Sequence, residues 1–196
     1  MYKKIRLNIL LKIQKIFSSK KNDIHPIEKK INYIFKNQDY LIQAFTHKSI
    51  DKGPRNNYER LEFLGDSVLD LIISKALLKE FPEGDEGLLT ERRAALVQKS
   101  YLAKIGKLLN LMKNLKINHN VDLKIDKIAD KQLANLFESL LGAIFLDGGI
   151  KPCENLILNT VWPHRNIAWE KTNYKGKLIE YCHSKDIENP IFELKD

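Results

Sequence analysis

Apolar residues recur at helical spacing along most of the 196-residue chain, and no segment alternates between apolar and polar residues as a half-buried strand would. The first predicted helix follows Pro26 and places four apolar residues on one face: Ile27, Ile31, Ile34 and Phe35. Further helices are predicted over 39–49, 58–80, 88–111 (in one or two pieces), 130–148 and 151–171. Glycine, proline and asparagine mark breaks at 51–57 and 82–87. The pattern predicts an all-α main body.

The predicted helix over 58–80 carries acids among apolar residues. Four carboxylates fall within about 60° of one another around the helix axis, and they are Glu59, Glu62, Asp66 and Asp70. The opposite side is apolar, with Leu61, Leu64, Val68, Leu71 and Ile72. Phe63 lies beside the acids, as it would on a helix that is buried or sits at an interface. Two interpretations stay open: a solvated acidic face, or a cluster that needs a counter-charge such as a divalent cation.

Composition adds a basic balance to this acidic stripe. The chain has 33 Lys and Arg against 25 Asp and Glu, and its net charge is +8. A basic protein with one concentrated acidic stripe favours a polyanionic partner with a metal between the two. The alternative is compositional drift, because Lys, Ile and Asn are all abundant, as an AT-rich genome would favour.

Targeting and redox signals are weak. Residues 1–24 form a basic, partly apolar segment whose longest apolar run is too short for a signal peptide, so we expect a basic arm, with weak affinity for a membrane surface as a lesser option. No run approaches the length of a transmembrane helix. Cys153 and Cys182 form no CxxC pair, and the histidines show no zinc-binding spacing. A reducing cytoplasm is the expected location, without membrane insertion.

Four segments resemble the ribonuclease III family of double-stranded-RNA endonucleases. The most specific is "ERLEFLGDS" (59–67), and the others are "AFTHKS" (44–49), "FPEGDEGLLTERRAALVQ" (81–98) and "LFESLLGAIFLDGG" (136–149). The resemblance covers about residues 25 to 165 in the family's order. It implies an all-helical catalytic domain over 25–166, a linker over 167–172, and, over 173–196, the start of an α/β double-stranded-RNA-binding domain.

The resemblance also implies a chemistry and a set of site residues. The family acts as a homodimer with Mg²⁺, for which Mn²⁺ could substitute, and it leaves 5′-phosphate and 3′-hydroxyl ends. Carried over by position, the metal ligands are Glu62, Asp66, Asn135 and Glu138, and the catalytic residues are Glu59, Asp66 and Glu138. Phe63 matches an aromatic knob that inserts into the partner subunit, and Glu86 matches an acid near the dimer's catalytic valley. RNA-contacting residues stay unassigned.

Asn135 departs from the family, which usually has Asp three residues before the glutamate of this helix. An amide keeps a carbonyl oxygen that can bind Mg²⁺ but removes one negative charge. One interpretation is an active nuclease, processing ribosomal and messenger RNA precursors, that tolerates Asn135. The second is a weakened site in a protein that mainly binds double-stranded RNA. A third, from another class, is a helical interaction domain whose acidic stripe docks a basic partner.

Overall fold

The computed structural model describes residues 25–121, 125–170 and 174–192, so the predicted arm over 1–24 lies outside the described residues. The helices are α2 (Pro26–Ile31), α3 (Gln38–Ala44), α4 (Glu59–Glu80), α5 (Glu86–Val97), α6 (Lys99–Leu108), α7 (Asp126–Gly148), α8 (Ile150–Thr160), α9 (Arg165–Glu170) and α10 (Tyr174–Ser184). Two 3₁₀ turns, η1 (Leu111–Asn114) and η2 (Trp162–His164), join them. Over these residues the extended pairing is limited to an isolated bridge between Thr46 and Lys116, and the all-α prediction is confirmed.

Three predicted helices are shorter or more broken than the apolar pattern indicated. The first ends at Ile31, because Asn32 adopts the left-handed conformation, and Ile34 is exposed rather than on the buried face. The second ends at Ala44 instead of running to 49. The single helix predicted over 151–171 is divided into α8, η2 and α9, with Pro163 inside the 3₁₀ turn.

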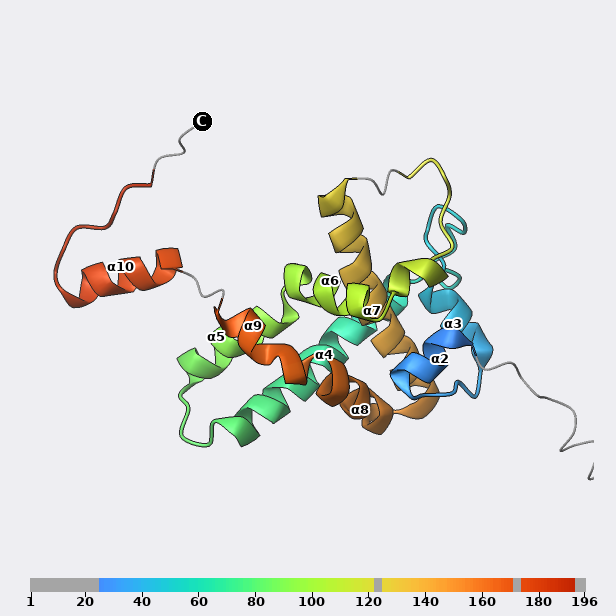
Figure 1. The fold of residues 1–196 in the computed structure, drawn as a ribbon, viewed down its shortest axis with the longest axis horizontal. Helices are drawn as coiled ribbons and strands as arrows, with labels where there is room; N and C mark the ends of the chain where they lie inside the picture. The colour runs from blue at the N-terminus through green and yellow to red at the C-terminus, as the bar shows by residue number, and fades with distance from the viewer. Residues whose placement is uncertain (1–24, 122–124, 171–173, 193–196) are drawn as a thin grey trace, which may run out of the picture.

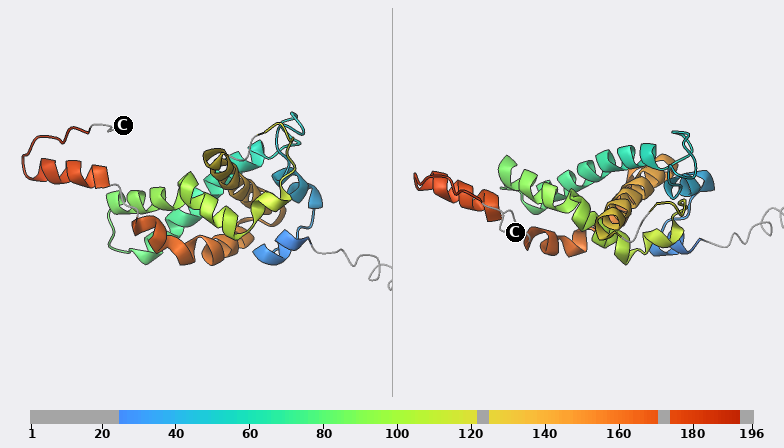
Figure 2. Two further views of the ribbon diagram at one scale, coloured as in Figure 1. Left: turned by 45° about the horizontal axis from the view of Figure 1, so that its top comes forward. Right: turned by 90° about the horizontal axis from the view of Figure 1, so that it is seen from above.

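The crossing of α4 and α7 is the most extensive helix contact in the described structure, and both helices run through the centre of the molecule (Figures 1 and 2). Gly65 and Gly142 face each other there. A Cβ added to Gly65 would lie 2.6 Å from the carbonyl carbon of Glu138, and one added to Gly142 would lie 3.0 Å from the carbonyl carbon of Leu61. The two glycines let the backbones approach far more closely than side chains would allow. The apolar core surrounds this crossing.

The outer helices are tied to the central pair by polar and aromatic contacts. The Asp147 carboxylate, near the end of α7, accepts hydrogen bonds from the Tyr33 hydroxyl at 2.6 Å and from the Lys36 and Asn37 amides, both at 2.9 Å. Trp169 of α9 donates to the Arg92 carbonyl, and the Arg92 guanidinium lies over its ring. Most of the predicted linker is thus helical and packs on α5. No described helix is both long and apolar enough to cross a membrane.

Candidate active site

The glycine crossing sets the position of the acidic residues. Glu62 precedes Gly65 on α4 by three residues and Asp66 follows it directly, so both lie where α4 meets α7. Glu138 precedes Gly142 by about one turn on α7, and its backbone carbonyl faces Gly65. The structure therefore brings together Glu62, Asp66 and Glu138, three residues that the sequence predicted as metal ligands.

Glu138 is the most buried of these carboxyls, with 4% of its surface exposed. Burial raises its pKa from 4.5 to about 7, the Lys99 ammonium opposes the rise, and the charges of Glu62, Asp66 and Asp70 add to it. Burial also raises the pKa of Glu62, where Lys99 again opposes the shift and Glu59 reinforces it. The cluster thus holds more negative charge than its surroundings stabilise, which favours a bound cation.

Asn135 lies one turn before Glu138 on the same buried face of α7. Its side-chain oxygen accepts a hydrogen bond of 3.0 Å from the Lys99 ammonium, which also lies 3.8 Å from a carboxylate oxygen of Glu62. Sequence reasoning missed Lys99. It is one of many lysines in the chain, and it comes from α6, 36 residues before Asn135, so no local pattern indicated its position.

Glu59 stands at the edge of this cluster. Its half-exposed carboxylate accepts a 2.8 Å hydrogen bond from Lys48 of the "THKS" segment. In that segment His47 is buried: its Nδ1 accepts a hydrogen bond from the Ser49 amide and lies 2.8 Å from the Ser49 hydroxyl, and the His47 amide donates to the Lys116 carbonyl. These contacts give His47 and Ser49 a structural role, whereas Lys48 balances the charge of Glu59.

The donor set suits a hard divalent cation. Carboxylates and an amide oxygen, contributed by two crossing helices, are ligands that Mg²⁺ and Mn²⁺ accept. In the side-chain positions of this structure, no three His, Cys, Asp or Glu residues among those described converge tightly enough to hold a metal. Residues Glu62, Asp66, Asn135 and Glu138 nevertheless fit the group chemically, since a buried carboxyl with a raised pKa lies beside other acids.

An exposed apolar stripe runs along α4 next to the acids. It consists of Phe63, Leu71 and Leu78, and Phe63 is 79% exposed. Leu71, which the spacing placed on the apolar side opposite the acids, is exposed, because the core contacts of α4 come from Leu61, Val68 and Ile72.

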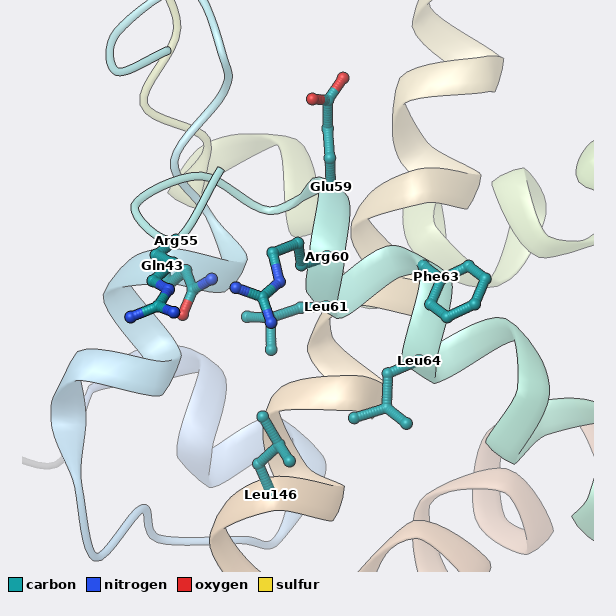
Figure 3. A pocket seen from close by; sticks show the side chains of 8 residues that line it. All are labelled: Gln43, Arg55, Glu59, Arg60, Leu61, Phe63, Leu64 and Leu146. Atoms are coloured by element: carbon teal, nitrogen blue, oxygen red, sulfur yellow. The ribbon is translucent and has the colours of Figure 1, made fainter. Parts of the chain in front are cut away.

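Phe63 also borders a hollow of about 550 Å³. Leu61, Leu64 and Leu146 give it aliphatic walls, and Arg55 and Arg60 line one side (Figure 3). Glu59 stands at its rim and points away from the arginines (Figure 3). Glu86 is placed elsewhere: it accepts a hydrogen bond from Thr90 and lines a second hollow with Leu78 and Arg93.

The chain is similar to known ribonucleases over most of its length. A family model described as "Ribonuclease-III-like" matches residues 37–164. Ribonuclease 3 of Sulfurovum sp. is 35% identical over 176 residues, covering 88% of this chain and 78% of that protein. Ribonuclease 3 of Wolinella succinogenes is 38% identical over 174 residues, covering 87% of this chain and 72% of that protein.

A solved structure is similar as well. The nuclease domain of ribonuclease III from Campylobacter jejuni, described with a flexible region involved in its dimer formation, superposes with a TM-score of 0.64. The two sequences are 35% identical, and the match covers 71% of this chain and 96% of the Campylobacter jejuni chain. With its signature helix, glycine crossing and acidic cluster in place, this chain belongs to the ribonuclease III family.

Proposed function

We propose that this chain is a metal-dependent endonuclease that cleaves double-stranded RNA to 5′-phosphate and 3′-hydroxyl ends. Its family membership supports an endoribonuclease. The observation that carries the proposal further is the meeting of Glu62, Asp66 and Glu138 at the α4–α7 crossing. The two packed helices hold the backbones of these three residues near one another, so rotation of their side chains would bring the oxygen ligands to one divalent metal.

The residues of the site have different roles in the proposed reaction. Glu62, Asp66 and Glu138 would hold the metal together with the Asn135 oxygen. When bound, a divalent cation of this kind lowers the pKa of a water molecule and stabilises the charge of the leaving 3′-oxygen. The close contact of its helix with Gly65 positions Glu138 beside α4. Glu59, paired with Lys48, stands between the cluster and solvent, where it can orient an incoming RNA strand or a water molecule.

A homodimer accounts for the exposed stripe. A two-fold interface brings the same patch of both subunits together, so a knob and its socket must lie on one face. Phe63 and the hollow beside it meet that condition. The aliphatic walls of the hollow can take an aromatic ring, and Arg55 and Arg60 can lie against its face. The stripe with Leu71 and Leu78 extends this contact toward Glu86.

The proposal extends to the cellular location, the RNA substrates and the C-terminal segment. We place the enzyme in the cytoplasm, acting on structured precursors of ribosomal and messenger RNA, and two free cysteines are consistent with a reducing compartment. α10 fits the opening helix of a double-stranded-RNA-binding domain over 173–196. Residues 185–192, which follow it, contain no strand.

The test is cleavage of a long labelled RNA duplex with Mg²⁺, with Mn²⁺ and with chelator. Wild-type protein should give discrete products bearing 5′-phosphates, and chelator should abolish them. Glu138→Ala should remove activity, whereas Glu91→Ala, an exposed glutamate on α5, should leave it unchanged. Cleavage with Mn²⁺ alone would identify Asn135 as a weak ligand. Duplex binding without any cleavage would instead establish the alternative, a binding protein on the nuclease scaffold.

A further inference from the structure

We propose that the Lys99 ammonium is a resident counter-cation of the acidic cluster, held there by Asn135, and that a divalent metal must displace it to bind. The inference rests on the proposed function, because it concerns the same carboxylates. It assigns a role to a residue that no sequence pattern indicated, and it gives Asn135 a purpose beyond that of a tolerated substitution.

The contacts place Lys99 among the residues that would hold the metal. Its ammonium is 3.0 Å from the Asn135 side-chain oxygen and 3.8 Å from a Glu62 carboxylate oxygen. A metal bound to that Asn135 oxygen at about 2.1 Å would lie within about 5 Å of the ammonium. Two cations at such a separation repel each other strongly in a partly buried site. The lysine and the metal therefore compete for the same oxygens.

Lys99 is also able to leave. It is the first residue of α6, and its side chain is 53% exposed, so the four-carbon stem can swing into solvent without disturbing the core. Asn135 holds it through a neutral acceptor, which is weaker than a carboxylate. An aspartate at 135 would bind the ammonium as an ion pair and retain it more firmly. The combination of Asn135 and Lys99 thus gives a counter-charge that is present without metal and releasable with it.

Lys99 favours the charged form of the carboxyls beside it. It lowers the pKa of Glu138 and of Glu62, in both cases against the larger effect of burial. Other cations act on the outer acids, with Lys48 beside Glu59 and Lys131 near Glu62, but Lys99 is the cation that lowers the pKa of the buried Glu138. A resident ammonium limits the repulsion among the acids and keeps α4 and α7 packed until a metal arrives.

The experiment is a calorimetric titration of the purified full chain with Mn²⁺, without RNA, at low ionic strength. Lys99→Met keeps the aliphatic stem and removes the charge, and Lys99→Gln is a second variant in case methionine perturbs the fold. Lys104→Met, an exposed lysine on the same helix, is the matched control. We expect Mn²⁺ to bind both Lys99 variants about tenfold more tightly than wild type, and the Lys104 variant as wild type does.

The possible outcomes separate this inference from the proposed function. Equal Mn²⁺ affinity of wild type and both Lys99 variants would overturn the inference and leave the metal site intact. Weaker binding by the variants would also overturn it, because Lys99 would then support the ligands rather than compete with the metal. If no protein bound Mn²⁺, the proposed metal-dependent function would fall, and the inference with it.

Discussion

Gly65→Ala tests whether the helix crossing builds the active site. The added Cβ would lie 2.6 Å from the carbonyl carbon of Glu138 and 2.9 Å from the amide nitrogen of Gly142, and closer still to the Glu138 carbonyl oxygen. Ordinary contacts of a Cβ begin at 3.4 Å. All three neighbours are backbone atoms, so no flexible side chain can move aside. The helices must separate by about 1 Å at this point to accept the methyl group.

Two magnitudes follow from that displacement. Overpacking of a core costs about 1–3 kcal/mol, and the rigid backbone neighbours place this substitution at the upper end, about 3 kcal/mol of the free energy of unfolding. The same movement carries the Glu138 carboxylate away from Glu62 and Asp66. A misplacement of about 1 Å among catalytic groups can lower the rate about 100-fold. Gly65→Ala should therefore lose activity even under conditions where most molecules stay folded.

The assay combines urea unfolding with the rate of RNA cleavage. Gly87→Ala is the matched control, because Gly87 is exposed on α5 and its added Cβ would meet only the Asp85 carboxylate at 3.6 Å. That control should gain up to about 1 kcal/mol, as alanine usually does in a helix. If Gly65→Ala unfolded at the wild-type urea concentration and cleaved RNA at the wild-type rate, the close crossing would not be what positions the acids.

Three further predictions concern the site and the dimer. The pKa of Glu138 is about 7 in the folded protein and 4.5 when unfolded, so the folded state holds the proton more tightly between these values. The free energy of unfolding of the metal-free protein should therefore fall by about 3 kcal/mol as the pH rises from 4.5 to 7. Urea unfolding at several pH values should show the fall in wild type and not in Glu138→Gln. Phe63→Ala should weaken dimerisation at least tenfold by sedimentation, whereas Leu158→Ala, exposed on α8, should not; equal dissociation constants would contradict the knob. Asn135→Asp should raise cleavage at limiting Mg²⁺, because the added negative charge attracts the metal, although the same charge retains the Lys99 ammonium more firmly. Combining it with Lys99→Met should therefore raise cleavage further, and an unchanged Mg²⁺ titration of Asn135→Asp would show that position 135 does not limit metal binding.

Local patterns predicted the central helices because their causes are local. α4 spans the predicted segment, since its apolar period is long and a proline follows its end. Contacts that do not follow from the periodicity of a single helix could not be predicted in this way. Glu28 is buried with 2% of its surface exposed, because the Phe35 amide, the Gln38 side chain and the His25 amide satisfy its carboxylate.

The candidate site likewise has parts that follow from local spacing and parts that depend on how the helices pack. The acids could be placed on one stripe from their spacing, and their family resemblance indicated that α7 would close the cluster. The ammonium of Lys99 could not be predicted, because its position depends on how α6 packs against α7. The exposure of Leu71 could not be predicted either, because helical periodicity gives an apolar face but the neighbouring helices determine which part of that face they cover.

The pairing of α4 with α7 also has a consequence for how the protein is made. The two halves of the acidic cluster are separated by about 70 residues of chain, since one lies near residue 66 and the other at residue 138. At ordinary elongation rates the ribosome needs roughly 4 to 14 seconds to synthesise that interval. During this time α4 lacks α7, the helix with which it makes its most extensive contact. The growing chain therefore cannot cut RNA, including the message and ribosome that are producing it, until synthesis has passed α7.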